Sequence, residues 1–175
     1  TLNFLNLPAI EIGLKQIKRI GYPTIHLRIE TLTKWILVKL IELKHENGNK
    51  LIQVYGPTEM IMRGGTISMN FFDVNGHFID HGIIEDHANR ENISIRTGCF
   101  CNPGDGEVAL GISKNDLNTC FSMKPRLEYK DLRSCIDGKS TGAVRISIGL
   151  VSNFSDVYKF VELASKFVNK SLSEL

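Results

Sequence analysis

Residues 143–168 read AVRISIGLVSNFSDVYKFVELASKFV, and this stretch indicates the class of fold. Its first six residues, 143–148, predict the last strand, and Gly149 follows it. Asn153, with Asp156 three residues later, resembles a capping box that begins a helix. The apolar residues of this helix recur at spacings of three and four, which places them on one face: Val157, Phe160, Val161, Ala164, Phe167 and Val168.

Two further helices are predicted in the N-terminal part of the chain. Asn6 can cap the first, Pro8 fits its first turn, and Gly21 closes it. Its apolar residues have helical spacing: Leu7, Ile10, Leu14 and Ile17. The second helix follows Pro23 and continues for roughly 22 residues, about 33 Å at 1.5 Å per residue. Turn residues at 46–49 end it.

The middle of the chain combines short strands, turns and short helices. Strands are predicted at residues 51–55, 66–72 and 92–96, a turn at 73–76, a weak helix at 79–89, a cysteine-containing loop at 98–106, and short helices at 113–120 and 129–136. Helices therefore precede, interrupt and follow a few strands. This order predicts an α+β fold, a two-layer sandwich, with residues 1–175 forming one domain.

The composition excludes several classes of protein. Apolar residues make up 42% and charged residues 23% of the 175 residues, values typical of a globular protein. The net charge is +2 and the basic residues are scattered, so no nucleic-acid surface is indicated. Lys39 and Glu42 interrupt the densest apolar stretch, so no membrane span is expected. The four cysteines, without a signal peptide, predict reduced thiols and a cytoplasmic location.

Residues 96–104, RTGCFCNPG, carry the strongest local signal for chemistry. A cysteine reacts as the thiolate, and an ordinary thiol pKa near 8.5 leaves only a few per cent ionised at neutral pH. Arg96 favours the anion, and the glycine and proline residues let the sulfur of Cys101 stand clear of the core. The alternative, and the commoner fate of an unpaired cysteine, is a small apolar filler. A zinc site completed by Cys120 and Cys135 is a further alternative.

Arg145 is a charged residue in a strand whose other residues favour burial, which is costly unless the charge is paired. Its guanidinium group suits a carboxylate, which it can bind through two hydrogen bonds. That carboxylate can belong to an acidic residue of the chain or to a ligand. The pair Gly64-Gly65 after Arg63 allows either a close approach of backbone to a ligand or only a turn.

These motifs together resemble the C-terminal domain of class V aminotransferases and cysteine desulfurases. Arg-Thr-Gly-x-x-Cys at 96–101 is followed by Val-Arg-Ile-Ser-x-Gly at 144–149 and a closing amphipathic helix. The string at 99–104 is similar to the aminotransferase-like portion of molybdenum cofactor sulfurases, and Thr1-Leu2-Asn3 matches the segment that follows the cofactor domain. The resemblance implies the small domain of a fold type I pyridoxal-phosphate enzyme, with a small, mostly antiparallel sheet and without the cofactor-binding large domain.

The resemblance also implies roles for individual residues. Cys101 corresponds to the cysteine that takes sulfur from the substrate as a persulfide, and Arg145 to the arginine that holds the substrate's carboxylate. Arg96 corresponds to an arginine beside the same pocket, and Thr1 to a threonine that reaches the cofactor phosphate of the partner subunit. Cys99 corresponds to an extra cysteine without an assigned role. No metal ligand is implied.

The function implied is that of a cysteine desulfurase or sulfurtransferase. The complete enzyme would use pyridoxal phosphate, act on a cysteine-like amino acid, pass sulfur to an acceptor protein or cofactor, and form a homodimer. The family's cofactor-binding lysine lies in a Ser-x-His-Lys context that this chain lacks, so we expect this chain alone to hold no cofactor and to be inactive. Residues 105–107, Asp-Gly-Glu, replace the Ala-Cys usual in molybdenum cofactor sulfurases, which leaves the sulfur acceptor unassigned.

Two alternative functions remain open from the sequence. One is a transaminase or another amino-acid-converting member of the same family, in which Cys101 is incidental. The other is a non-catalytic module that binds through its thiols or a metal ion.

Overall fold

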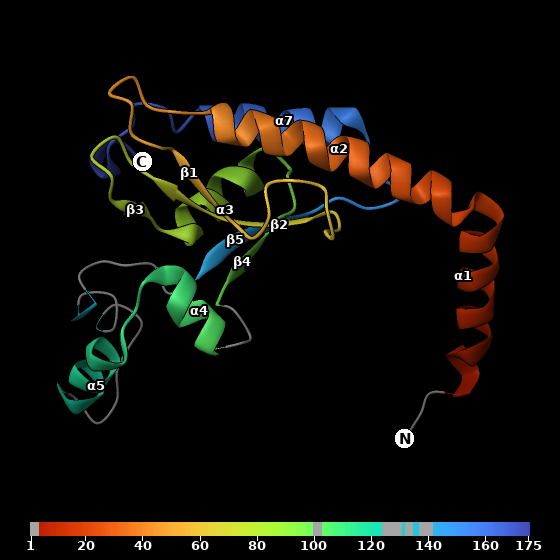
Figure 1. Cartoon of the computed structure of the whole chain (residues 1–175), viewed down its shortest axis with the longest axis horizontal. Helices are drawn as coiled ribbons and strands as arrows, with labels where there is room; N and C mark the ends of the chain where they lie inside the picture. Colours follow the sequence, from red (N-terminus) through yellow and green to blue (C-terminus); the bar gives the residue numbers. More distant parts are fainter. Residues whose placement is uncertain (1–3, 100–102, 124–130, 132–134, 137–141) are drawn as a thin grey trace.

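The computed structural model describes residues 4–99, 103–123, 131, 135–136 and 142–175, and it has the predicted α+β fold (Figure 1). Its helices are α1 (Leu7–Ile20), α2 (Tyr22–Glu42), α3 (His81–Arg90), α4 (Pro103–Leu110), α5 (Lys114–Met123) and α7 (Phe154–Ser165), with short 3-10 turns at Phe4–Asn6 and Leu172–Glu174. Its strands are β1 (Ile52–Tyr55), β2 (Thr66–Phe72), β3 (Phe78–Ile79), β4 (Arg96–Gly98) and β5 (Ala143–Ser147).

The described strands form one small antiparallel sheet. Their order across the sheet is β1-β2-β5-β4, and the short β3 pairs with β2 outside this path. Each of these pairings is antiparallel. β5 therefore lies between β2 and β4, although it follows both in the sequence. This order brings together side chains that are far apart along the chain.

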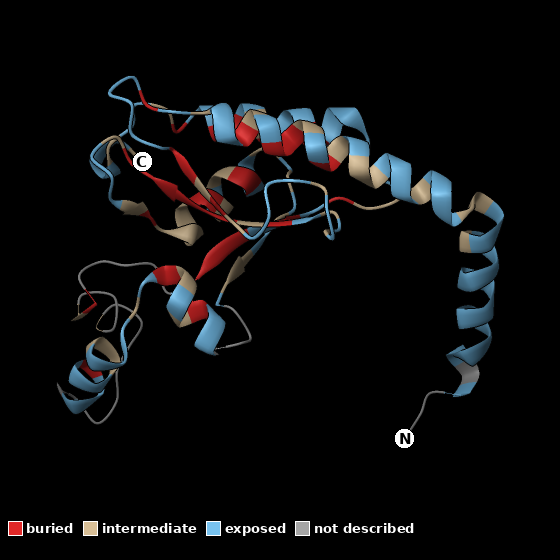
Figure 2. Cartoon of the chain, viewed as in Figure 1, coloured by how far each residue is buried: buried red, intermediate tan, exposed pale blue. Residues whose placement is uncertain are grey.

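Helices α2, α3 and α7 cover one face of the sheet (Figures 1 and 2). Alternate residues of the central strands point into this layer, as the buried residues Ile67, Met69, Phe71, Val144 and Ile146 do. The helices meet them with their own buried residues: Ile36, Leu37 and Leu40 on α2, Ile84 and Ala88 on α3, and Val157, Phe160 and Leu163 on α7. The two-layer arrangement expected from the sequence is thus confirmed.

The start of α7 has the capping geometry that the sequence indicated. The side chain of Asn153 accepts a hydrogen bond from Asp156 N, and the side chain of Asp156 accepts one from Asn153 N. These bonds satisfy two backbone donors that a helix start leaves without partners. The last strand and the helix that follows it are therefore joined as the sequence predicts.

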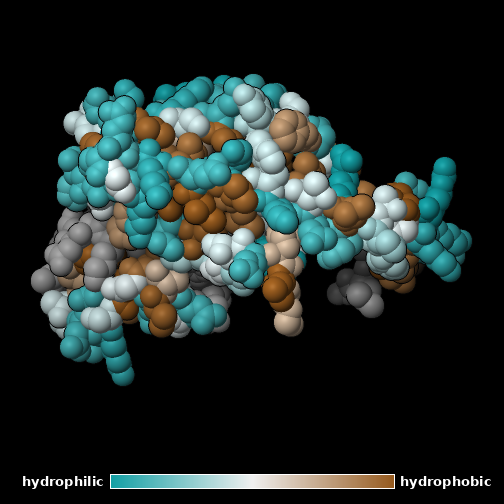
Figure 3. Space-filling model, turned by 45° about the horizontal axis from the view of Figure 1, so that its top comes forward, coloured by the Kyte–Doolittle hydropathy of each residue, from teal (hydrophilic) through white to brown (hydrophobic). Residues whose placement is uncertain are grey.

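The first helix, α1, has no buried residue and projects away from the rest of the molecule (Figures 1 and 2). Gly21, with φ of +91°, separates it from α2. The apolar residues Leu7, Ile10 and Leu14 are all about half exposed or more. Hydrophobic side chains are accordingly visible at the surface at this end of the molecule (Figure 3). α2 enters the core only from Thr33 onward.

Three local predictions are corrected by the structure. α4 begins at Pro103, within the predicted loop 98–106, because proline is well suited to the first turn of a helix. β4 begins at Arg96, where the strand predicted at 92–96 ends. The two-residue strand β3 was not predicted, because so short a run has no periodicity. The helix predicted at 129–136 lies mostly outside the described residues.

The reduced state expected for all the cysteines is wrong for two of them. Cys120 and Cys135 form a disulfide bond, with their Cα atoms 5.7 Å apart. The sequence offered no sign of this pairing, because spacing alone does not determine which cysteines meet. The disulfide also removes both residues from the zinc site considered above. Separately, none of the described helices is long and apolar enough to cross a membrane.

Candidate functional site

A row of polar side chains crosses the face of the sheet that is turned away from α2, α3 and α7. In the strand register, Arg96 on β4 pairs with Arg145 on β5, and Arg145 pairs with Ser68 on β2. Ser68 in turn pairs with Tyr55 on β1. Directly paired residues on neighbouring antiparallel strands point to the same face, with Cβ atoms about 4.5–5.5 Å apart. Four strands thus contribute one residue each to the row.

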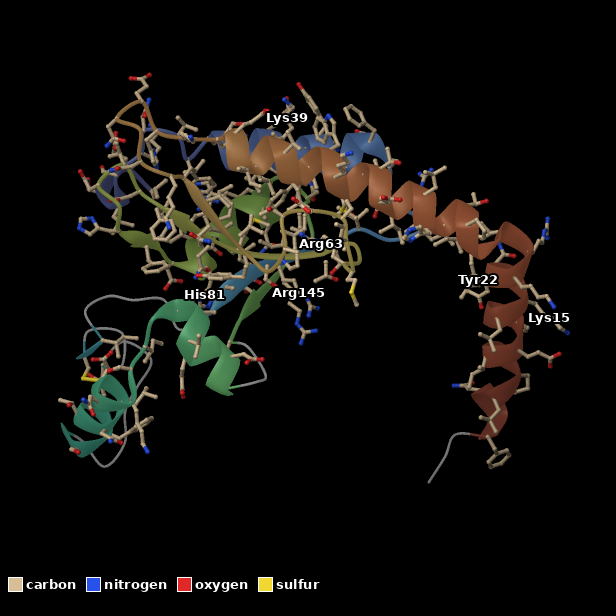
Figure 4. All side chains as sticks on the ribbon, in the orientation of Figure 1. Lys15, Tyr22, Lys39, Arg63, His81 and Arg145 are labelled. Carbon is tan, nitrogen blue, oxygen red and sulfur yellow. A yellow bond between two sulfur atoms is a disulfide. The ribbon has the colours of Figure 1, made fainter. Side chains whose placement is uncertain are left out.

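The alternation of β5 fixes the direction of Arg145. Its neighbours Val144 and Ile146 are buried beneath the helices, so Arg145 points to the opposite face. Figure 4 shows its side chain on the side of the sheet away from α2. Arg145 is exposed, although its place in a strand whose other residues favour burial suggested a half-buried charge.

A pocket of about 170 Å³ lies over three residues of this row, Ser68, Arg145 and Arg96. Its lining residues are Ser68, Arg96, Thr97, Gly98, Cys99, Ala143 and Arg145. A small amino acid or a similar anion is of this size. The structure therefore brings together two of the residues that the sequence singled out, Arg96 and Arg145.

No acidic side chain in the described part of the chain neutralises the two arginines. Among the described residues, no acidic side chain lies within ion-pair distance of Arg96 or Arg145. Like charges directly opposite each other on a sheet repel, so this pair is unfavourable unless an anion comes between them. Arg28 and Arg63 differ, since both donate hydrogen bonds to backbone carbonyl groups. The Arg96–Arg145 pair is thus suited to bind an anionic ligand.

The strand that carries Arg96 is held by a contact on the helix-covered face of the sheet. Thr97, the next residue, points to the helical face, where its Oγ1 donates a hydrogen bond of 2.6 Å to Oε2 of Glu85 on α3. A hydrogen bond to a charged acceptor is among the stronger ones. β4 is only three residues long, so this contact helps to hold Arg96 in register with Arg145.

Cys99 also lines the pocket, as a free and exposed thiol directly after β4. Cys101 and Thr1, for which the resemblance implied roles, lie outside the described residues. Of the two cysteines in this motif, the structure therefore places Cys99 at the pocket. Gly142 supports this arrangement, because a Cβ there would lie only 2.6 Å from the carbonyl carbon and oxygen of Gly98.

The Arg63-Gly64-Gly65 segment serves the fold. Arg63 donates hydrogen bonds to the carbonyl oxygens of Pro57 and Thr66, which closes its own loop. A side chain at Gly65 would collide with the backbone of Ile148, so the close approach considered for a ligand is made to the protein itself. The turn interpretation holds for this segment.

Metal binding has no support in the described part of the chain. Among those residues, no group of three or more His, Cys, Asp or Glu side chains could hold a metal ion.

Ser68 and Tyr55 are the members of the row that sequence analysis missed. Burial raises the pKa of Tyr55 above its ordinary value near 10, although the hydrogen bond from Asn70 Nδ2 opposes this shift. Tyr55 therefore stays neutral at physiological pH. The alternation within residues 66–72 could have indicated that Ser68 lies on the polar face, but not which residues lie beside it.

Comparison with known proteins identifies relatives along almost the whole chain, although no family model matches it. The chain is 36% identical over 174 residues to the molybdenum cofactor sulfurase of Solanum lycopersicum, and 32% identical over 166 residues to that of Homo sapiens. The chain is a homologue of one segment of the molybdenum cofactor sulfurases. The alignments cover 99% and 92% of this chain but 21% and 18% of those sulfurases, so the chain spans about one fifth of their length.

The fold has a counterpart among solved structures. The apo structure of a cysteine desulfurase from Thermococcus onnurineus NA1 superposes with a TM-score of 0.56, over 89% of this chain and 29% of that protein. Sequence identity is 18%, so this likeness concerns the fold alone. The sulfurase relatives confirm the resemblance to molybdenum cofactor sulfurases that the sequence motifs indicated. The superposition confirms the fold that this resemblance implied.

Proposed function

We propose that this chain forms the substrate-binding small domain of a pyridoxal-phosphate-dependent enzyme that takes sulfur from cysteine or a similar amino acid. The observation that carries the proposal is the pairing of Arg96 with Arg145 in a small pocket that Cys99 also lines. The homology to a segment of the molybdenum cofactor sulfurases supports sulfur transfer as the chemistry.

Arg145 binds the substrate's carboxylate in this proposal. Its guanidinium group can make two parallel hydrogen bonds to the two carboxylate oxygens, which fixes the orientation as well as the charge. The rigid antiparallel pairing of β5 with both neighbouring strands holds the backbone of Arg145 in place. Arg96 adds a second positive charge, which favours anions in the pocket, including a nearby thiolate.

Cys101 is the proposed sulfur acceptor. Its thiolate attacks the sulfur atom of the substrate cysteine, an S–S bond forms, and the substrate's Cβ–S bond breaks with its electron pair left on carbon. Protonation of that carbon gives alanine, and Cys101 carries the persulfide. The exposed Cys99, two residues earlier in the sequence and at the pocket, supports this assignment.

Pyridoxal phosphate, when bound in the complete enzyme, would accept the electron pair released from the breaking C–S bond. The described residues fit the substrate side of such a site, since they present a thiol and two arginines that no described acidic side chain neutralises. The proposal assigns only Thr1 to the cofactor, at the phosphate group held by the partner subunit. A lysine in the family's Ser-x-His-Lys context is absent from this sequence.

The proposal extends to the assembly and its setting. The complete enzyme is a homodimer, and it passes sulfur to an acceptor protein or cofactor. The proposed location is the cytoplasm. The expectation of reduced thiols no longer supports this location, because Cys120 and Cys135 form a disulfide bond.

The test is a comparison of Cys101→Ser, Arg145→Ala and a control, Cys99→Ser, in the complete enzyme that contains this chain. We expect Cys101→Ser to abolish persulfide formation and sulfide release from cysteine while cofactor absorbance is unchanged. Arg145→Ala should raise KM for cysteine by about 10- to 100-fold, the cost of a lost charge-assisted hydrogen-bond pair.

Two results would contradict this proposal. Unchanged sulfide release by Cys101→Ser would remove the persulfide role. If the same variant still converted amino acids, the transaminase alternative would stand. An unaltered KM for Arg145→Ala would remove the carboxylate site.

A further inference from the structure

We infer that Ser68 is a third ligand of the anion that Arg145 holds, and that its hydroxyl group positions the substrate's carboxylate. The inference rests on the proposed function, because it concerns the same pocket. It adds a residue on β2, a strand from which neither the motifs nor the resemblance assigned any functional residue.

The strand register places Ser68 beside Arg145. The two residues are direct partners across β2 and β5, as Arg145 and Arg96 are across β5 and β4. All three line the same pocket. Ser68 therefore stands on one side of Arg145 and Arg96 on the other, and an anion bound at Arg145 lies within reach of both.

The hydroxyl group of Ser68 is available for a ligand. It makes no hydrogen bond within the part of the chain that the structure describes, and Ser68 is only half-buried. Thr97 and Asn70, on the neighbouring strand positions, do have protein partners. Three side chains with hydrogen-bond donors therefore line the pocket: Ser68, Arg96 and Arg145. None of the three donates to an acceptor among the described residues.

The short side chain of Ser68 adds a donor that loses little conformational freedom on binding, unlike the two long arginine side chains. Each arginine has several rotatable bonds, whose freedom must be given up when an anion binds. Serine has one such bond, and its backbone is held in the middle of the sheet by pairing with β1 and β5. A carboxylate offers about four acceptor positions, so it can accept from the arginine fork and from a hydroxyl group together. Ser68 thereby fixes the carboxylate's orientation without adding charge.

The test is a titration of the 175-residue chain with L-alanine, a small amino acid with a carboxylate and no reactive sulfur. Binding is followed through the NMR signals of the arginine Nε–H groups and the backbone amides of β2 and β5. We expect Ser68→Ala to weaken binding by about 5- to 10-fold, the value of one hydrogen bond. Ser68→Thr, which keeps the hydroxyl group, should remain within about twofold of the unaltered chain.

Thr66→Ala is the matched control, because Thr66 lies two residues earlier on the same strand and face but outside the pocket. It should bind as the unaltered chain does. Equal affinity of Ser68→Ala and the unaltered chain, or an equal loss in Thr66→Ala, would overturn the inference.

The variant Arg145→Ala distinguishes failure of the Ser68 inference from failure of the proposed carboxylate site. If it abolishes binding while Ser68→Ala does not change it, only the role of Ser68 is wrong. If L-alanine binds to neither the unaltered chain nor the variants, or if Arg145→Ala binds it normally, the inference fails together with the carboxylate site.

Discussion

Gly142 and Gly98 meet where β5 begins and β4 ends, beside the pocket. A Cβ at Gly142 would lie 2.6 Å from the carbonyl carbon and oxygen of Gly98, closer than such atoms come in proteins. Gly98 itself has φ of +119°, a conformation that favours glycine. Both positions therefore admit only glycine, and together they determine where the chain leaves the sheet toward Cys99.

Gly142→Ala should push the end of β4 away from β5. We expect it to lower the free energy of unfolding by about 1–3 kcal/mol, the usual cost of overpacking. It should also change the rate at which Cys99 is alkylated, measured by mass spectrometry in a Cys101→Ser background. Gly64→Ala is the control, because a Cβ there meets nothing within 4 Å and its φ is not positive. Equal behaviour of the two variants would show that the contact has no such role.

At the scale of elements, the apolar residues of α1 and α2 both recur at helical spacing, but the two helices have different surroundings. Leu14 on α1 is 56% exposed, whereas Leu40 on α2 is fully buried against the sheet. The spacing of apolar residues predicts a helical face in both cases, but it cannot show whether another element covers that face.

This difference can be measured by replacing each leucine with alanine. Leu40→Ala should cost about 2–5 kcal/mol of unfolding free energy, because it leaves a cavity in the core. Leu14→Ala should change it by less than about 0.5 kcal/mol. Urea unfolding of this chain gives both values. A large loss for Leu14→Ala would mean that α1 packs against other residues of this chain.

The elements also show what sequence patterns can predict. The long helices and β2 have strong periodicity, and Gly21 and Asn153 mark helix ends through their own backbone chemistry. Residues 103–106 of α4 were assigned to a loop because Pro103 and two glycines are typical of loops as well as of a helix start. Long and regular elements were thus predictable, and short ones depended on contacts that the sequence does not reveal.

The site was predictable only in part for a related reason. The motifs and the family resemblance singled out Arg96 and Arg145, and the structure brings the two residues together. Ser68 and the Cys120–Cys135 disulfide were missed, because strand register and cysteine pairing depend on which distant segments meet. Such information belongs to the tertiary structure.

At the scale of the whole molecule, the C-terminal segment is tied to the sheet by buried polar groups. The carboxylate of Asp73, which directly follows β2, is almost fully buried and accepts hydrogen bonds from His77 N and Leu172 N. His45 is buried nearby; its Nδ1 accepts from Asn169 N, and its Nε2 bonds to the carbonyl oxygen of Phe72. These contacts join the segments around His45 and Asp73 to the C-terminal residues Asn169 and Leu172.

The Asp73 contacts predict an acid-sensitive stability. Burial alone would raise the pKa of Asp73, but hydrogen bonds from His77 and Leu172 and the charge of His77 lower it below its ordinary value of 3.8. A lowered pKa in the folded state means that this carboxylate stabilises the fold above pH 3.8, and that the contribution is lost as the pH falls through the folded-state pKa.

Asp73→Asn should therefore be less stable than the unaltered chain at pH 7, and the difference should shrink toward pH 3. Urea unfolding at a series of pH values measures it. Asp86→Asn, at an exposed position on α3, serves as the control. A difference that stays constant with pH would contradict the assignment to the Asp73 carboxylate.

The central place of β5 also sets an order of events during synthesis. A ribosome makes β2 and β4 well before residues 143–147, yet β4 pairs with no described strand except β5. Until β5 emerges, β2 and β4 present open edges to neighbouring nascent chains, and Arg96 has no arginine beside it, because Arg145 belongs to β5. Completion of the anion pocket therefore coincides with closure of the sheet, so a polypeptide released before residue 143 would lack both.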